Sequence, residues 1–259
     1  MPELPDIVNY VEAIQSRVAG ATLRSIRIRD PFVLRSVSPS PDELAGSAVI
    51  RVGHIGKRIV IEVEGDRFAV IHLMIAGRLR WETAPRPAGK QVLALLEFDS
   101  GTLVMTEAGS KKRASLQLIS DAETLRALDR GGIDPIASTA VAFAARLRSE
   151  NHTLKRSLTD PRLFSGIGNA YSDEILHRAR ISPLRLTSRL SDEAVARLRD
   201  ATIAVLTEWT DRLRAENAGR FPEKVTAFRP EMAVHGKYGQ PCPVCDHRDP
   251  WDDWDHWDH

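Results

Sequence analysis

Residues 151–183 read NHTLKRSLTDPRLFSGIGNAYSDEILHRARISP. This stretch predicts a short basic helix carrying Lys155, a tight turn over Ser165–Gly168 and a second helix with Asn169 as its N-cap. Glycines let the backbone approach a ligand closely, and the N–H groups at a helix start favour an anion. Lys155, Gly168 and Asn169 are therefore candidate phosphate-binding residues. The alternative is a plain glycine turn between two packed helices.

The N-terminus, MPELPD (1–6), holds a second chemical signal. Removal of Met1 would leave Pro2 with a free secondary amine beside the carboxylate of Glu3. Elsewhere in a chain the proline nitrogen is a tertiary amide with no proton. At this position Pro2 is a candidate nucleophile that forms a Schiff base, and Glu3 is a candidate proton shuttle.

A helix is expected directly behind these residues, with Asp6 as its cap and Gly20 at its end. The spacing of its apolar residues, Ile7, Val11, Ile14 and Val18, indicates one buried face. The positive end of the helix disfavours a protonated amine and favours an ionised carboxylate, which suits both proposed roles. The alternative is that the two prolines merely lead into a helix.

Short β-branched runs fill the chain from about Ala21 to Leu118 and predict a β-sandwich or barrel of about 100 residues. Several runs alternate apolar and polar residues, and Asp99–Gly101 is typical of a hairpin turn. The expected strands lie in TLRSIRI (22–28), AVIRV (48–52), RIVIEVEG (58–65), FAVIHLMI (68–75), VLALLEFDSG (92–101) and TLVMTE (102–107).

A linker, GGIDP (131–135), separates these strands from a helical part. Helices are expected over Val141–Ser149, Leu154–Leu158, Ala170–Ala179 and Ser191–Glu216. The fold class is therefore α+β. We expect a helix and β-sandwich catalytic domain over 1–130, a helical domain over 131–235 and a tail over 236–259.

Composition limits the class of protein. A chain of 259 residues can bury a core and has room for two domains. Membrane-spanning helices need roughly 18 apolar residues in a row, which the sequence lacks, and its acidic start is unlike a secretory signal. The two cysteines form one Cys-x-x-Cys pair, which fits a reducing compartment. We expect a cytoplasmic, nucleoid-associated monomer with no membrane partner.

The net charge of +1 hides an asymmetry. Residues 246–259 contain six Asp and one Arg, so residues 1–245 carry 35 basic against 29 acidic side chains. This surplus suits a polyanionic partner only where the basic side chains cluster.

Taken together, MPELPD, the lysine of HIGKR at position 57 and Lys155 followed by SGIGNAYSDEIL resemble the formamidopyrimidine-DNA glycosylase and endonuclease VIII family over nearly the whole chain. The MPELP start is closer to the formamidopyrimidine-DNA glycosylase branch. The resemblance implies a two-layer β-sandwich led by a helix, then a helical domain with a helix-two-turn-helix. The implied partner is damaged double-stranded DNA.

The resemblance also implies residue roles. Pro2 attacks C1′ of the damaged nucleotide, expels the base and forms an imine that undergoes β- and δ-elimination, while Glu3 moves the protons. Lys57 is similar to the family lysine that grips a phosphate beside the lesion, and Lys155 and Asn169 to its phosphate-binding pair. Glu174 matches a family glutamate and is expected to hold the helical turn near the active site.

Turning a nucleotide out of the duplex leaves a gap that inserted side chains fill. The segment IHLMIAGRL resembles the family's insertion strand, so Met74 or Ile75 is a candidate wedge. The alternative places both in the sandwich core. The second insertion loop lacks its aromatic residue here, and its basic residues, Lys111, Lys112 and Arg113, are candidate contacts to the DNA backbone, or a solvated loop.

The tail departs from the family pattern. Cys242 and Cys245 have the spacing of half a zinc site, but the second cysteine pair is absent. In one interpretation His256 and His259, or His247, complete a structural zinc site. In the other, the finger is truncated and the acidic tail is disordered. We favour this second interpretation because the ten residues between Cys245 and His256 leave little chain for the missing hairpin, and because six aspartates would repel DNA where the family attracts it. No metal or organic cofactor is expected in catalysis.

The leading hypothesis is a base-excision repair DNA glycosylase with apurinic/apyrimidinic lyase activity on oxidised or ring-opened bases. The alternative is a damaged-DNA-binding protein of this family without catalysis, suggested by the broken tail and the altered loop. Retention of Pro2 and Glu3 argues against it. A third hypothesis, a zinc-dependent interaction module, is supported only by the Cys242 and Cys245 pair and is weak. The segment expected to form the base pocket, about 217–232, offers no residue with a definite base-reading role.

Overall fold

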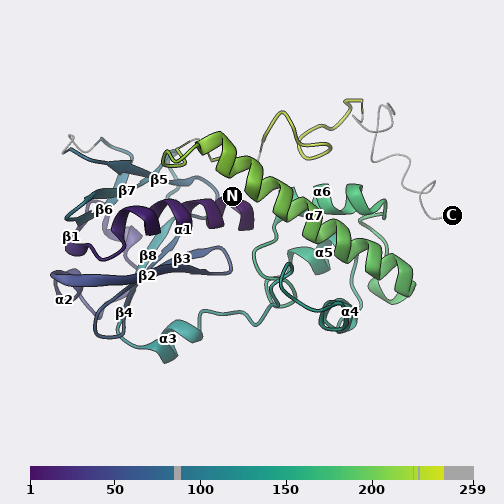
Figure 1. Cartoon of the computed structure of the whole chain (residues 1–259), viewed down its shortest axis with the longest axis horizontal. Helices are drawn as coiled ribbons and strands as arrows, with labels where there is room; N and C mark the ends of the chain where they lie inside the picture. The colour runs from purple at the N-terminus through teal and green to yellow at the C-terminus, as the bar shows by residue number, and fades with distance from the viewer. Residues whose placement is uncertain (85–88, 224, 227, 242–259) are drawn as a thin grey trace. The chain divides into compact units, whose positions relative to one another are not determined.

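The computed structural model describes residues 1–84, 89–223, 225–226 and 228–241 (Figure 1). The chain forms two compact units. The N-terminal unit comprises Met1–Asp129 together with Leu213–Val225, and the helical unit comprises Arg130–Arg212 together with Thr226–His259. The sequence-based division places 213–225 in the helical domain, whereas in the structure this returning segment packs with the N-terminal unit.

Helix α1, Leu4–Val18, is the first element of the N-terminal unit. Ile7, Tyr10, Ile14 and Val18 are all fully buried, so the predicted apolar face is confirmed. The predicted cap, Asp6, is wrong, because the helix starts three residues earlier with Glu3 as its N-cap. Two prolines cost little in a first turn, whose N–H groups have no partner within the helix.

The sheet contains eight antiparallel strands in the order β5-β7-β6-β1-β2-β3-β4-β8. It consists of two four-stranded halves, and β1 joins them through only two residue pairs with β2, Thr22 with Ala48 and Leu23 with Ser47 (Figure 1). The strands are β1 Thr22–Ile28, β2 Ser47–Ile55, β3 Arg58–Val63, β4 Arg67–His72, β5 Gly77–Glu82, β6 Val92–Phe98, β7 Gly101–Glu107 and β8 Ser115–Ile119.

One apolar core lies between α1 and both halves of the sheet. It takes side chains from all eight strands and from the returning segment, which contributes Phe221 and Val225. The predicted two-layer sandwich led by a helix is thereby confirmed. Strands β5 and β8 were not predicted, and β4 ends at His72 rather than continuing through Ile75. Short elements complete this unit: η1 Pro31–Val33, α2 Pro41–Leu44 and α3 Ala122–Arg126.

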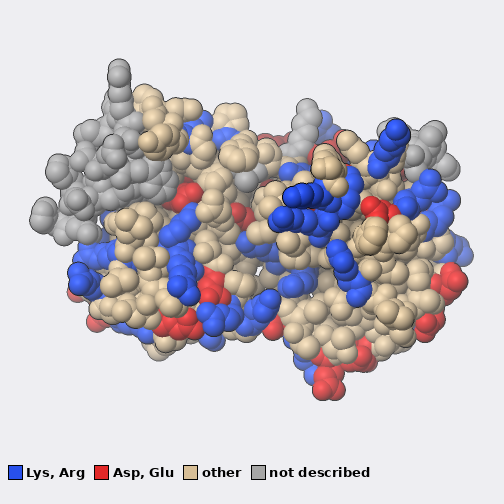
Figure 2. Space-filling view, turned by 180° about the vertical axis from the view of Figure 1, so that it is seen from behind, with Lys and Arg blue, Asp and Glu red and all other residues tan. Residues whose placement is uncertain are grey.

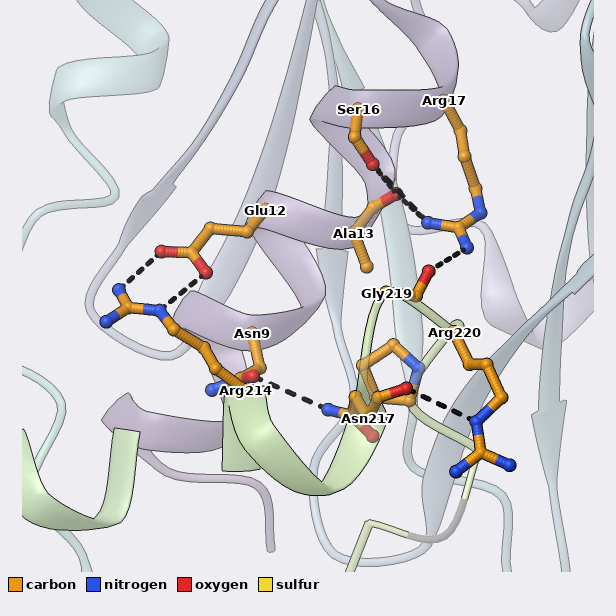
Figure 3. Close-up of a pocket in the computed structure, with 10 residues that line it drawn as sticks. Asn9, Glu12, Ala13, Ser16, Arg17, Arg214, Asn217, Gly219 and Arg220 are labelled. Carbon is orange, nitrogen blue, oxygen red and sulfur yellow. Dashed lines mark hydrogen bonds and ion pairs between the residues drawn. The ribbon is translucent and has the colours of Figure 1, made fainter. Parts of the chain in front are cut away.

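Polar contacts tie the returning segment to the outer face of α1, around a cavity of about 200 Å³ (Figure 3). Arg214 makes two bonds to the carboxylate of Glu12, at 2.8 and 2.5 Å. Arg17 donates to the carbonyl of Gly219 at 3.1 Å and lies 5.5 Å from the ring centroid of Phe221. These bonds attach the end of α7, Asp192–Asn217, and the turn after it to the sandwich.

The helical unit is built from α4 Ala140–Arg148, α5 Leu154–Thr159, α6 Asn169–Ala179, η2 Thr187–Arg189 and most of α7. All four predicted helices are present within two residues of their expected bounds. Aromatic pairs pack inside the unit: Phe143 against Phe164 with centroids 4.8 Å apart, and Tyr171 against Trp209 at 6.0 Å. The predicted helical domain is confirmed.

Phe221 is expected to hold the returning segment in place. Its ring lies 5.8 Å from that of Tyr10 and 6.5 Å from that of Trp81. Phe221→Ala should lower the free energy of unfolding by about 3 kcal/mol, as for other large-to-small core changes. Urea unfolding measures this. The exposed Phe32 is the matched control, since Phe32→Ala should cost less than about 0.5 kcal/mol; equal losses would contradict the assignment.

Candidate functional site

The N-terminal residues form the first part of the candidate site. Pro2 is buried, and Glu3 is 2% exposed at the start of α1. The backbone N–H of Glu3 donates to the carboxylate of Asp6 at 3.0 Å, which closes a capping box. Because α1 is anchored in the core, this cap fixes the position of the residues before it.

An amine at this end of the chain is less basic than usual. Burial lowers the pKa of the Met1 amino group, the nearby Glu3 carboxylate raises it, and Arg78 and Lys57 lower it further. The net shift is downward, so a larger share of this amine is neutral near pH 7 than for an exposed terminus.

Lys57 lies in the two-residue turn of the β2–β3 hairpin. Ile55 pairs with Arg58 across this turn. Gly56 has φ +56°, which matches a type II′ turn and requires glycine at its first position. Burial lowers the pKa of the Lys57 ammonium, and the Glu3 carboxylate acts in the opposite direction. The hairpin thus places a half-buried cation near Glu3.

His72, at the end of β4, adds no charge to this cluster at neutral pH. Burial lowers its pKa to about 4, and the positive charges of Arg58 and Lys57 contribute. A neutral imidazole beside two cations shows that the surroundings are electropositive and poorly hydrated.

The candidate wedge residues lie in the tight turn between β4 and β5. Met74 has φ +52° and is half-buried, and Ile75 is 57% exposed, so neither belongs to the core. Arg78 braces the turn by donating to the carbonyls of Ile75 at 3.1 Å and Gly77 at 2.7 Å. The alternative of two ordinary core residues is therefore wrong.

The basic loop after β7 folds around the carboxylate of Glu107, which is 2% exposed. This carboxylate accepts the backbone N–H groups of Arg113 at 2.8 Å and Ala114 at 3.0 Å. Lys112 donates to the carbonyl of Glu107, so its ammonium is used within the loop. The side chains of Lys111 and Arg113 are exposed and available for a partner.

The phosphate-binding candidates of the helical unit meet at the start of α6. Gly168 is the N-cap and Asn169 is the first helical residue, so the prediction of Asn169 as the cap is wrong. The carbonyl of Gly168 accepts the N–H of Ser172 at 3.1 Å, which begins the helix one residue early. Lys155 donates to the carbonyl of Asn169 at 2.7 Å and forms an ion pair with Asp173.

Two adjacent acids on α6 hold the chain that follows α7. Glu174, 6% exposed, accepts the backbone N–H groups of Ala233 at 2.8 Å, Val234 at 2.9 Å and His235 at 2.9 Å. These three bonds go to Ala233–His235, and the expectation that Glu174 holds the helical turn near the active site stays a prediction. Asp173 contacts Nδ1 of His235 at 2.8 Å.

Within the described part of the chain there is no group of three or more His, Cys, Asp or Glu side chains that could hold a metal ion. The candidate zinc ligands lie outside the described residues: Cys242, Cys245, His247, His256 and His259.

Comparison with known proteins decides the family. Residues 1–110 match the formamidopyrimidine-DNA glycosylase N-terminal domain, and residues 132–213 match the helix-two-turn-helix domain of the same family. A formamidopyrimidine-DNA glycosylase from Heliobacterium modesticaldum is 31% identical over 260 residues, covering 95% of this chain and 92% of the relative. The chain belongs to the formamidopyrimidine-DNA glycosylase family.

Further glycosylases of this family are similar over the same length. A formamidopyrimidine-DNA glycosylase of Thermus thermophilus is 32% identical, covering 95% of this chain and 91% of the relative. The crystal structure of wild-type Lactococcus lactis formamidopyrimidine-DNA glycosylase with DNA containing an oxidized pyrimidine aligns with a TM-score of 0.83 at 26% identity, covering 95% and 92% of the two chains. The crystal structure of a mutant of that enzyme with Fapy-dG-containing DNA aligns with a TM-score of 0.81 at 25% identity, covering 95% of this chain and 93% of the mutant chain.

The surface of this glycosylase family member carries basic patches. Figure 2 shows Lys and Arg side chains gathered on each of the two units, with Asp and Glu side chains among them. In the described portion of the chain, none of the helices has the length and apolar character needed to cross a membrane.

Several residues that organise these sites were not predicted from the sequence. Asp173 and His235 act through contacts to residues distant in the sequence. Glu107 accepts N–H groups six and seven residues further along its own loop, a spacing that belongs to no helix or strand period. Arg78 directly follows the tight turn that it braces. For Asp173, the local signal that could have been used is its place next to Glu174, a few residues after the glycine turn.

His72 should make stability depend on pH. Its folded pKa, about 4, lies below the ordinary 6.5, so the unfolded chain binds more protons between these values and stability falls as pH falls through that window. The loss attributable to His72 between pH 7 and pH 5 is about 2 kcal/mol. His72→Gln should flatten this part of the curve in urea unfolding; an unchanged slope would contradict the prediction.

Glu174→Gln should destabilise the segment that Glu174 holds. Hydrogen bonds to a charged acceptor contribute about 1.5–3 kcal/mol, and a neutral amide cannot accept all three N–H groups. Amide hydrogen exchange at Ala233–His235 should accelerate by more than about tenfold. As a control, Glu208→Gln removes an exposed ion pair with Arg178 and should leave these amides unchanged.

Proposed function

We propose that the protein is a bifunctional DNA glycosylase and apurinic/apyrimidinic lyase that removes oxidised or ring-opened bases. Family membership supports glycosylase chemistry. The observation that carries the finer proposal is the placement of Pro2 and Glu3, both buried at the start of an anchored helix in an environment that lowers the basicity of an amine.

The proposed reaction begins after removal of Met1. The lone pair of the Pro2 nitrogen attacks C1′ of the damaged nucleotide, the bond from C1′ to the base breaks, and the base leaves with a proton. The bond from C1′ to O4′ then breaks as O4′ accepts a proton, which opens the sugar ring and leaves an iminium between the Pro2 nitrogen and C1′. This iminium makes the C2′ proton acidic. Loss of that proton expels the 3′ phosphate by β-elimination, δ-elimination then expels the 5′ phosphate, and water hydrolyses the iminium. Glu3 is the proposed proton carrier.

Phosphate contacts are the proposed role of the cations near each site. Lys57 would hold a phosphate beside the lesion, and Lys155 with the N–H groups at Gly168 and Asn169 would hold another. Lys155 is partly neutralised by Asp173, so the backbone N–H groups carry much of this binding. Lys111 and Arg113 remain for the DNA backbone, whereas Lys112 is used inside its loop.

Met74 and Ile75 are the proposed wedge that fills the gap left by the extruded nucleotide, because a half-buried and an exposed apolar side chain on a braced turn suit insertion between bases. Damaged double-stranded DNA is the proposed partner; the Lactococcus lactis enzyme is bound to DNA containing Fapy-dG or an oxidized pyrimidine. Pro2 and Glu3 supply the nucleophile and the proton carrier, so we propose that catalysis uses no cofactor. Any zinc at Cys242 and Cys245 would be structural.

Borohydride trapping tests this proposal. Reduction of the imine should link the processed protein covalently to an oligonucleotide carrying an oxidised purine or an abasic site, because imines accept hydride. Pro2→Gly should reduce trapping by more than about tenfold. Mass spectrometry of the native protein establishes in parallel whether Met1 is removed.

A matched control is Pro5→Gly, which lies in the same turn but lacks the terminal nitrogen, and it should trap as the wild type does. Salt-dependent binding to damaged duplex without any adduct or strand cleavage would overturn the lyase and favour the alternative of a damaged-DNA-binding protein.

A further inference from the structure

Phe228 of the helical unit is exposed to an unusual degree for its type. Its side chain is 72% exposed, whereas phenylalanine is among the residues most often buried. Its backbone N–H donates to Thr226 Oγ1 at 3.1 Å. The residue lies in the segment for which the sequence supplied no base-reading residue.

One face of the Phe228 ring is supported. The ring stacks on the imidazole of His235 with centroids 5.5 Å apart and an interplanar angle of 24°. Gly236 packs against its edge: a Cβ at that position would lie 2.9 Å from Cδ1 of Phe228, and φ of Gly236 is +74°. Both facts require glycine there.

The support is itself held rigidly. His235 is fixed through its ring by Asp173 at 2.8 Å and through its backbone by Glu174 at 2.9 Å. Asp173 also pairs with Lys155, which donates to the carbonyl of Asn169. A continuous set of contacts therefore links the exposed aromatic ring to the proposed phosphate site of the same unit.

We propose that Phe228 is a stacking platform for the damaged base once the nucleotide has left the duplex. The ligand class is a planar oxidised or ring-opened nucleobase. An extruded base loses its stacking neighbours, and a supported aromatic ring replaces one of them. The inference rests on the proposed function and adds to it the residue that contacts the base rather than the sugar or phosphate.

Two substrates separate this role from the lyase chemistry. One duplex carries 8-oxoguanine or a formamidopyrimidine, and the other is identical but carries a preformed abasic site, which has no base to stack. Under single-turnover conditions Phe228→Ala should slow base excision by about tenfold or more. Cleavage and borohydride trapping of the abasic duplex should stay within about twofold of wild type, which also shows that the variant is folded.

Phe228→Trp should restore excision, because it restores an aromatic face. Phe32→Ala, which removes an equally exposed phenylalanine from the N-terminal unit, should change neither activity. Unchanged excision by Phe228→Ala, or equal losses on both substrates, would overturn the platform. If the wild type cleaves neither duplex, the proposed function is wrong, but the stacking role of Phe228 can still be tested by binding. In that case, equal affinity of the wild type and Phe228→Ala for the lesion duplex would overturn the stacking role as well.

Discussion

Burial of one face of α1 against both halves of the sheet is the constraint on which the N-terminal site depends. The helix begins at Leu4, so the residues that precede it cannot move independently of the core. Ile7, Tyr10 and Ile14 are fully buried, and the returning segment adds Phe221 against Tyr10. A flexible terminus would lose most of its conformational freedom on meeting a substrate. Here folding has already restricted the terminus, and the positive end of α1 disfavours a protonated amine and favours an ionised carboxylate beside it.

Desolvation sets the protonation of this site. The same burial lowers the pKa values of the Met1 amine, Lys57 and His72, while the Glu3 carboxylate raises those of the first two. Cations close together and away from water destabilise one another, so a polyanion that neutralises them gains binding energy. The low pKa of His72 is a consequence of the same arrangement and requires no catalytic role.

In the helical unit, two neighbouring acidic residues fix the position of the chain that follows α7. Glu174 satisfies three backbone N–H groups of the chain after α7, and Asp173 contacts both Lys155 and His235. Buried carboxylates are costly unless they are paired or hydrogen-bonded, and both are. These bonds fix the position of Ala233–His235 relative to the start of α6. A loop that follows a long helix is thus held beside the start of α6.

Local pattern alone determined the α+β class, the apolar face of α1, six of the strands and the four main helices, because hydrophobic period and turn residues act over a few positions. It also singled out Pro2 and the glycine turn, whose chemistry depends on neighbours in sequence, whereas Lys57 was identified through the family resemblance. Tertiary structure alone decided that the returning segment packs with the sandwich, that Lys112 serves its own loop, and that Asp173 joins Lys155 to His235. The packing of the returning segment and the contacts of Asp173 depend on which distant groups share a buried space, and the Lys112 bond depends on how its loop folds. None of these contacts leaves a periodic signal in the chain.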